Sequence, residues 1–542
     1  MSPQLEIDHE SGEVTFTGTA PVVTPPVSQD GLQLGLSLSP SEKATLEHHI
    51  DVPVWLSWFE FPFRVKSTES DKVLPEATGW AMDAAARGPL NLVGTYVGVA
   101  LIVLASVDAG CTRVAGCEET IYGLKPSSML TTVTAVVGVL AALFMPIVGA
   151  VVDRTTHRRR IGIVSAVILV IITGIQIAIS KIDWFIILCL EAIGGFTLLI
   201  HGATVFSYLP DLAVCERDYV HYTARFNVVQ FVSQTLFALV VSLTSRFTRQ
   251  QGDPVGNALR TSRTASSVVF SMSLLLLGYA WTFSFRKRKA LHNLEDGESL
   301  LLVGFTSVLK TSRKVFKEYK ALKWLLIALL FSPEAGAGVI SSIAVTFLQV
   351  KVQMTPLELS YVLLTILVTQ IPGSLLSKFV CNRLNPMNSY RLALFSFTLS
   401  SALALTVTGP SRKSWVYFFA ALWGISLGWI YTSQRVLFCT LIPKGQEFEF
   451  MGIFTFFGQI LGWLPPVLFT VINEQGIDLQ WGFALLPFFF FMALLCTAFM
   501  GSYAEAVALV SPEAVTIAPD GDASSSHMDR TDESGHPGTK PV

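Results

Sequence analysis

Charge is scarce in this sequence. Asp, Glu, Lys and Arg make up 14% of its 542 residues, whereas soluble domains carry about 25%. Hydrophobic residues make up 51%, and the mean hydropathy is +0.53. These values exclude an ordinary soluble domain and predict an integral membrane protein in contact with a lipid bilayer. The net charge of −2 and the lack of a basic–aromatic pattern argue against nucleic acid as a partner.

The sequence also lacks the usual patterns of enzymes and metal sites. It contains no Walker A run, no Ser-His-Asp order and no HExxH, so we expect neither an ATP-driven pump nor a hydrolase. The seven cysteines include no pair with zinc-site spacing, and we expect no metal and no cofactor. Residues 1–30 lack the apolar core of a signal peptide, so we expect the first membrane helix to act as an uncleaved anchor.

What the chain does contain is a series of long apolar segments. A membrane helix needs about 20 such residues. We place twelve spans at 85–107, 127–150, 161–180, 184–209, 222–245, 265–285, 322–349, 357–380, 389–408, 414–440, 449–472 and 480–503. Pro146 and Gly149 near the end of the second span have counterparts in Pro372 and Gly373 of the eighth. We therefore predict an all-α fold of two pseudo-symmetric six-helix bundles, with a substrate site near the midplane between them.

The apolar segments divide the chain into five predicted parts. These are a cytosolic tail at 1–78, a six-helix bundle at 79–285, a cytosolic connector with an amphipathic helix at 286–321, a second bundle at 322–503 and a disordered tail at 504–542. Lys and Arg are more frequent in the loops on the side of Arg154, which places that loop and both tails in the cytosol. Cys111 and Cys117 lie on the other side and can form a disulfide if that compartment is oxidising.

The loop GAVVDRTTHRRR, between the second and third spans, is the most basic short stretch among the apolar segments. Gly149 allows a neighbouring helix to approach closely, and Asp153 stands at a helix end, where it can bind backbone N–H groups or an arginine of a partner helix. The simplest interpretation is a topogenic basic loop. The loop also resembles the GxxxDRxGRR motif of major facilitator transporters, which implies a gating role. The matching residues are Gly149, Asp153, Arg154, Arg158 and Arg159, with Thr156 in place of the second glycine.

A second and more specific pattern lies at 442–469, which contains PKGQE, then MG, FFGQ and GWLPP. This succession resembles the vacuole effluxer family related to autophagy-related protein 22. Trp80, Asp83 and the DRTTHRRR loop are also similar to that family, and the resemblance covers roughly 78–503. It implies export of amino acids from the vacuole or lysosome to the cytosol. The alternatives are a plasma-membrane proton-coupled carrier of another small solute and a non-transporting sensor with the same fold.

Glu334 is the first candidate for substrate binding or proton coupling. It follows Pro333 and precedes Gly336 and Gly338, about halfway through the seventh span, where these residues favour an interrupted helix. Transporters bind substrates at such interruptions. A carboxylate there binds a substrate ammonium, carries a proton or pairs with a neighbouring helix.

Other polar residues within the spans are weaker candidates. Glu191 and His201 are ten residues apart on one helix and point in different directions, so they do not form a pair. His201 either titrates near neutral pH or is a satisfied interior histidine. Tyr431 and Arg435 share a helix face, and Arg435 either binds a substrate carboxylate or extends to lipid head groups. Three glutamines either face a cavity or join helices: Gln459, Gln230 and Gln234. We expect a monomer that binds a small molecule, together with protons if transport is proton-coupled.

Overall fold

The chain is known from a computed structural model, which describes residues 52–67, 72–112, 114, 117–212, 216–288, 299–332, 337–442 and 447–510. Glu334 and most of the two predicted tails lie outside these ranges. The described chain is almost entirely helical, and its β-structure consists of two isolated bridges, Lys66 with Val73 and Ile121 with Leu124. The expected all-α class is confirmed.

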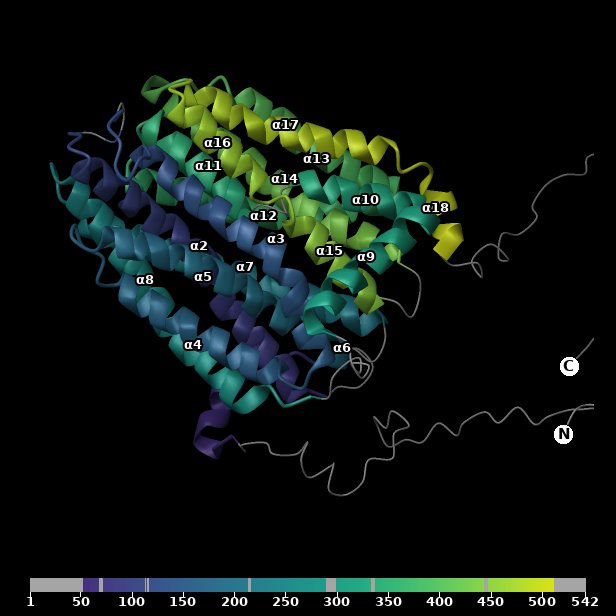
Figure 1. Ribbon diagram of the computed structural model, residues 1–542. Coiled ribbons are helices and arrows are strands. Elements are labelled where there is room, and N and C mark those ends of the chain that lie inside the picture. Colours follow the sequence, from purple (N-terminus) through teal and green to yellow (C-terminus); the bar gives the residue numbers. More distant parts are fainter. Residues whose placement is uncertain are drawn as a thin grey trace, which may run out of the picture. The chain divides into compact units, whose positions relative to one another are not determined.

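The N-terminal half is the set of helices up to residue 284 (Figure 1). Its elements are η1 (Val54–Phe63), α2 (Pro75–Asp108), η2 (Pro126–Ser128), α3 (Met129–Arg154), α4 (Arg158–Gln176), α5 (Trp184–Phe206), α6 (Leu209–Leu212), α7 (Glu216–Thr248), α8 (Pro254–Tyr279) and the π-helical η3 (Ala280–Ser284). The helix α2 packs against α5, α7 and α8 and is the central helix of this half.

The C-terminal half follows a connecting helix, α9 (Leu300–Glu318). Its elements are α10 (Lys320–Phe331), α11 (Ala337–Val350), α12 (Pro356–Leu384), α13 (Pro386–Ala404), η5 (Pro410–Arg412), α14 (Lys413–Thr440), α15 (Glu447–Gln459), α16 (Leu464–Glu474), α17 (Leu479–Ala498) and α18 (Tyr503–Val510). Asn385 separates α12 from α13 with a φ of 73°, and its side chain accepts a hydrogen bond from the Asn388 N–H at the start of α13. Asparagine tolerates this left-handed conformation better than most residues.

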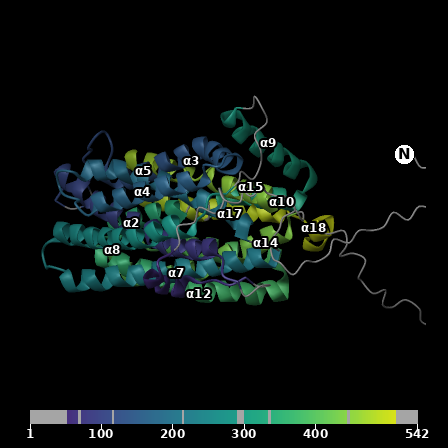
Figure 2. The same ribbon diagram turned by 90° about the horizontal axis from the view of Figure 1, so that it is seen from below.

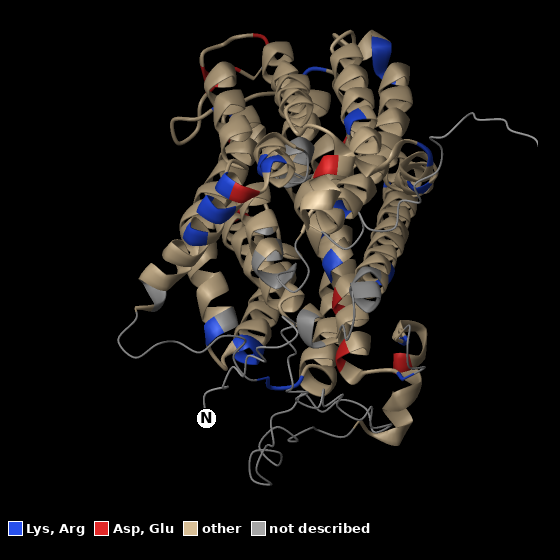
Figure 3. Ribbon diagram, turned by 90° about the vertical axis from the view of Figure 1, so that its right-hand side faces the viewer, with Lys and Arg blue, Asp and Glu red and all other residues tan. Residues whose placement is uncertain are grey.

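Ten helical segments of the described chain are long and apolar enough to cross a membrane. The predicted spans 322–349 and 389–408 are not among them, because the first is divided between α10 and α11 and the second, α13, is less apolar. The first span begins at Pro75 and not near residue 85. Its early polar residues, Asp83 and Arg87, are buried against other helices, so they do not face lipid as a hydropathy profile assumes. Figure 3 shows how few charged residues interrupt the helical ribbons.

Two hydrophobic cores form, one in each half. The first contains residues between Ala77 and Phe285, joined by Leu367 from α12, and the second contains residues between Val315 and Ala506, joined by Val99 from α2. The exact boundaries of the two bundles remain a prediction. Contacts between the halves are made chiefly by α7 with α12, by α3 with α11, α15 and α16, and by α2 with α11.

The amphipathic helix expected in the connector is α9, which lies against α3, α10 and α15 (Figure 2). Gly304 allows the contact with α3: a Cβ at this position would lie 2.5 Å from the carbonyl oxygen of Pro146. The exposed apolar residues of α9 include Leu302, Phe305 and Leu309. Because basic residues accompany them, among them Lys310 and Arg313, the helix has the character of an interfacial helix.

Candidate functional site

A buried cluster of polar side chains lies inside the N-terminal half. Asp83 on α2 and His201 on α5 are both fully buried, and His201 Nε2 lies 2.8 Å from Asp83 Oδ2. The same carboxylate oxygen accepts a hydrogen bond of 3.2 Å from the indole N–H of Trp281 in η3. Buried polar groups are costly unless they are paired. The pairing therefore joins α2, α5 and η3 at one point.

Arg87 belongs to the same cluster. Its Nε lies 3.7 Å from Asp83 Oδ1, one helical turn away on α2, and its guanidinium lies over the rings of Trp80 and Phe206. Aromatic faces attract cations through their quadrupoles. The Nη2 atom of Arg87 is buried and has no hydrogen-bond partner among the described residues. The charge of Arg435, on α14 of the other half, acts on Arg87 and repels it.

Ser165 on α4 extends the cluster. Its Oγ lies 2.8 Å from His201 Nδ1, and the same hydroxyl donates a hydrogen bond of 3.0 Å to the carbonyl oxygen of Gly162. Gly162 faces the Trp281 ring so closely that any side chain would overlap it. His201 was predicted from the sequence, but its partners were not. The spacing of Asp83 and Arg87, one helical turn apart, was the available signal for a paired acid and base.

Glu191 is separate from this cluster, as the ten-residue spacing predicted. Its Oε1 accepts a hydrogen bond of 3.0 Å from the side-chain amide of Gln176 on α4. Its Oε2 lies close to α2, where a Cβ at Gly94 would be 3.1 Å from it. Glu191 therefore joins three helices of the N-terminal half.

The candidates on α14 lie on a helix that packs against α12 and α13 of its own half. Gln434 is fully buried and Tyr431 and Arg435 are half-buried, with Arg435 close enough to act on Arg87. Glycines hold α14 against α12: a Cβ at Gly424 or Gly428 would overlap the backbone of that helix. This close packing fixes the position of the Arg435 backbone.

The glutamine candidates lie where helices cross. Gly88 on α2 approaches α7 so closely that a Cβ would lie 2.5 Å from the carbonyl oxygen of Gln230 and 3.3 Å from the Cβ of Gln234. Gln459 is the last residue of α15, and the chain turns through 460–463 before α16 begins. This interruption at the GWLPP pattern was not predicted.

Glu334 itself lies outside the described residues. The described chain on either side fits the expected interruption of the seventh span. The helix α10 ends at Phe331, and Ser332 has an extended conformation with φ of −82° and ψ of 162°. The next helix, α11, begins at Ala337.

The structure shows what the basic loop after α3 contacts. Arg158 is buried, donates a hydrogen bond of 3.0 Å to the Ser207 carbonyl oxygen and lies over the Tyr208 ring. Arg159 donates hydrogen bonds to the carbonyl oxygens of Phe285 and Trp281. The two arginines thus anchor the start of α4 to the ends of α5 and η3. The gating role of this loop stays a prediction.

One expectation about this loop is wrong. Among the described residues no atom lies within 4 Å of where a Cβ on Gly149 would be, so no described helix approaches closely there. The close approach occurs instead one turn earlier, at Pro146, because the glycine that permits it is Gly304 on α9. The side chain of Asp153 lies outside the described part of the chain, and that of Arg154 is half-buried.

Hydrogen bonds join the two halves at the opposite end of the helices, which we call the disulfide end because Cys111 and Cys117 are bonded there. Asn473 at the end of α16 donates through Nδ2 to Ser127 Oγ at 2.7 Å and to Ser128 Oγ at 2.6 Å. The next residue, Glu474, accepts a bond of 2.9 Å from the Lys125 N–H. These contacts close the disulfide end.

Other contacts extend this closure further along the helices. Thr131 and Thr470 share a hydrogen bond of 2.8 Å between their hydroxyls. A Cβ at Gly138 would lie 2.7 Å from the backbone nitrogen of Trp463 in the turn after α15. On α11, Gln349 donates a bond of 3.1 Å to the Val99 carbonyl oxygen of α2. The two halves therefore contact each other over several helical turns from the disulfide end.

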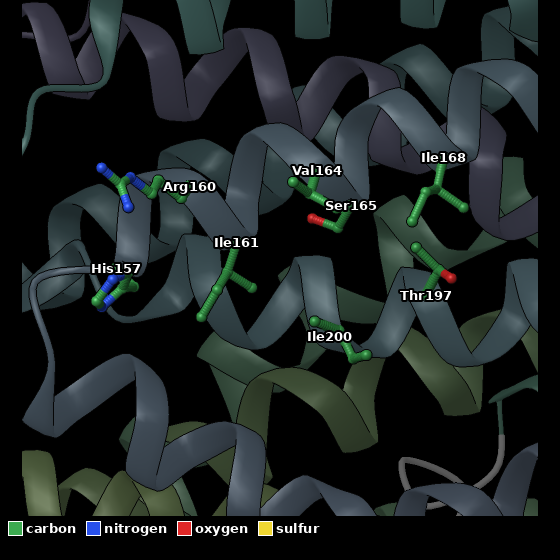
Figure 4. A pocket seen from close by; sticks show the side chains of 8 residues that line it. All are labelled: His157, Arg160, Ile161, Val164, Ser165, Ile168, Thr197 and Ile200. Atoms are coloured by element: carbon green, nitrogen blue, oxygen red, sulfur yellow. The ribbon is translucent and has the colours of Figure 1, made fainter.

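A pocket of about 340 Å³ lies between α4 and α5, as Figure 4 shows. It is lined by His157, Arg160, Ile161, Val164, Ser165, Ile168, Thr197 and Ile200. All of these residues belong to the N-terminal half, and none is a predicted substrate residue. Because its lining is largely apolar and does not include α14 or α11, this pocket is not the predicted midplane site.

Comparison with solved structures confirms the expected fold. A variant of the nucleoside transporter NupG aligns with a TM-score of 0.53 at 13% identity, over 78% of this chain and 100% of that chain. The xylose transporter XylE from E. coli, in an inward open conformation, aligns with a TM-score of 0.52 at 14% identity, over 79% of this chain and 98% of that chain. At these identities the likeness concerns the fold alone, and that fold is the major facilitator fold.

Comparison of sequences identifies the family. The family model "Vacuole effluxer Atg22 like" matches residues 74–503. Autophagy-related protein 22 of Yarrowia lipolytica is 28% identical over 198 residues, covering 35% of this chain and 33% of that protein. The protein of the same name from Saccharomyces cerevisiae strain S288c is 23% identical over 190 residues, covering 33% and 35%. The chain thus aligns with about a third of the length of these relatives. Together with its apolar helices, the family match makes the chain a multi-pass vacuolar membrane protein, and it belongs to the Atg22-like vacuole effluxer family.

Proposed function

We propose that this protein is a secondary transporter that exports amino acids from the vacuole or lysosome to the cytosol by alternating access. The two halves, predicted at 79–285 and 322–503, would rock about a site near the membrane midplane. The family match and the major facilitator fold support transport as the activity. The amino-acid substrate rests on the family resemblance and on the charges between the halves.

The observation that carries the substrate class is the buried guanidinium of Arg87, whose Nη2 has no hydrogen-bond partner among the described residues. Arg87 is 95% buried, and its charge and that of Arg435 repel. A buried guanidinium N–H without an acceptor is costly inside a membrane protein. A substrate carboxylate bound to Arg87 would satisfy this N–H, because guanidinium groups bind carboxylates strongly and often in bidentate geometry.

The second end of the substrate has a predicted partner as well. The ammonium of an amino acid would bind Glu334 near the interruption of the seventh span. We infer further that the state described is open to the cytosol, because the bonds of Asn473 and Glu474 close the disulfide end, which the distribution of Lys and Arg places on the lumenal side.

A counterflow screen on the purified full chain in liposomes tests this function. Vesicles loaded with unlabelled amino acids, sugars or organic anions are given the matching radiolabelled compounds outside. We expect exchange of amino acids only, and a large loss of exchange in Arg87→Lys and Arg435→Lys, because Lys cannot form the bidentate contact. Arg383→Lys is the matched control, since Arg383 lies over Phe379 at the end of α12.

The screen also separates the alternatives. Exchange of sugars or organic anions without amino acids would support a carrier of another solute. Amino-acid binding measured by calorimetry without any exchange would support a non-transporting sensor. Either result refutes the proposal.

A further inference from the structure

The buried cluster in the N-terminal half has two complete arrangements of hydrogen bonds. We propose that His201 carries the coupling proton of this transporter, with its imidazole held between the Asp83 carboxylate and the Ser165 hydroxyl. The inference rests on the transport activity proposed above and adds its driving ion. It is carried by the positions of three side chains on three different helices, α2, α4 and α5.

The first arrangement contains a neutral imidazole. Its Nε2–H donates to Asp83 Oδ2 at 2.8 Å, and its Nδ1 accepts the hydroxyl hydrogen of Ser165 at 2.8 Å. Neutral histidine has one donor and one acceptor, so both ring nitrogens are satisfied.

The second arrangement contains an imidazolium. Both ring nitrogens then donate, Nε2 to Asp83 and Nδ1 to Ser165 Oγ. The Ser165 hydroxyl has one hydrogen, and it turns to the Gly162 carbonyl oxygen, which lies 3.0 Å away. Both ring nitrogens are paired in both states, and only the Ser165–Gly162 bond is gained or lost, so a proton enters or leaves without leaving the imidazole unsatisfied. A histidine that is only structural needs a single arrangement.

The Asp83 carboxylate is the negative charge next to the His201 imidazole, and arginines lie around the two. On α2, the Asp83 carboxylate contacts His201 and is only loosely paired with Arg87, at 3.7 Å. On α4, Arg158 and Arg159 bring positive charge to the same end of the helices, although both are bound to carbonyl oxygens. These cations oppose a charged imidazole, and Asp83 offsets them.

Other charged and titratable groups lie on the neighbouring elements. On α4, Arg160 lines a pocket together with Ser165 and with His157, the residue before that helix. Glu76, nearer the start of α2, is paired with Arg288, 2.8 Å away. From η3, Trp281 contributes an N–H that does not titrate, and α7 carries the buried ionisable side chain of Tyr222. At the end of α3, the described side chain is that of Arg154. Asp83 is therefore the charged group that contacts the imidazole directly.

Protonation is linked to substrate through Arg87. When His201 becomes charged, Asp83 is shared between two cations, and its hold on Arg87 weakens. Arg87 then has more of its charge available for the substrate carboxylate between the halves. The proton comes from lumenal water and is released to cytosolic water together with the substrate. An acidic vacuole therefore drives export, with no other bond made or broken.

The proton site is tested first without any substrate. Full-length protein labelled with 15N-histidine is reconstituted in lipid, and infrared difference spectra are recorded as pH is lowered from about 8 to about 5, the range in which histidine titrates. The chain has nine histidines. We expect His201→Gln to remove one imidazole-to-imidazolium component from the spectrum, and the matched control His221→Gln, half-buried on α7, to retain it.

Ser165→Ala is the milder variant, and it keeps the test valid if His201→Gln fails to fold. Ser165→Ala removes the acceptor of the Nδ1–H in the imidazolium arrangement. The component assigned to His201 should therefore differ between this variant and the parent protein. A His201 component that Ser165→Ala leaves unchanged, or a spectrum that His201→Gln leaves unchanged, overturns the proposal.

The second test measures coupling. Proteoliposomes with an acidic interior receive a radiolabelled mixture of the standard amino acids inside, and its release and its exchange are followed separately. We expect His201→Gln to lose most of the acceleration by the pH gradient that the wild type shows. If this variant responds to the gradient as the wild type does, His201 is not the carrier. If the wild type moves no amino acid, the proposed substrate fails, while the infrared titration still decides the proton site.

Discussion

A methyl group added at Gly138 tests whether the disulfide end is held shut by direct contact between the halves. The ideal Cβ of an alanine would lie 2.7 Å from the backbone nitrogen of Trp463 and 2.8 Å from its Cα. Side chains are not found this close, and the obstacle is backbone, which cannot rotate away. The helix α3 and the turn after α15 must therefore separate.

The size of the effect follows from the cost of overpacking, which is about 1–3 kcal/mol. This cost is paid only in the state that is closed at the disulfide end, because the two backbones separate when the other state forms. Gly138→Ala should therefore lower the ratio of lumen-closed to lumen-open molecules about 5- to 150-fold.

Double electron–electron resonance measures this ratio directly. Spin labels at Tyr122 and Ile477, which are exposed near the disulfide end in the two halves, report the distance between them. We expect Gly138→Ala to populate a longer distance, whereas Gly278→Ala, with no atom within 4 Å of its Cβ, should match the parent protein. A folded Gly138→Ala protein with the parent distance distribution would refute the reasoning.

Three further predictions concern charges and the disulfide. The hydrogen bond from the Lys351 ammonium holds the pKa of Asp478 below its ordinary value. The ionised Asp478 carboxylate therefore stabilises the folded protein fully above pH about 4, and this stabilisation is lost as pH falls through the lowered pKa. Asp478→Asn should thus lower the melting temperature slightly at pH 7 and flatten its decline in acid; an identical profile would contradict this. Replacing Cys111 and Cys117 by Ser should reduce the free energy of unfolding by about 2 kcal/mol, as expected for a disulfide that closes a short loop. A membrane-impermeant reductant should break this disulfide only when it is added on the lumenal side. Reduction by the same reagent from the cytosolic side would show that the predicted topology is reversed. Glu334→Gln should weaken binding of zwitterions, because a buried ammonium loses its partner; wild-type exchange and gradient-driven flux would make Glu334 structural.

The family could be recognised from local sequence, and so could most of the membrane helices. Hydropathy over about 20 residues reports whether a segment suits lipid, and this property belongs to the segment alone. The same reasoning missed the start of α2 at Pro75, because Asp83 and Arg87 look unsuited to lipid until their burial among other helices is known. The turn after Gln459 was missed because its residues remain apolar through the interruption.

The contacts within the candidate site could be predicted from the sequence much less well than the helices, because they depend on the tertiary structure. His201 was a candidate by residue type, but its contact with Asp83 joins positions 118 residues apart. Lipid and protein interior are about equally apolar, so hydropathy does not reveal which face of a helix meets its neighbours. Only the packing of α2, α4 and α5 decides that a carboxylate, an imidazole and a hydroxyl form one chain of hydrogen bonds. The sequence by itself determined the membrane helices and the family, and the tertiary structure decided which buried polar groups act together.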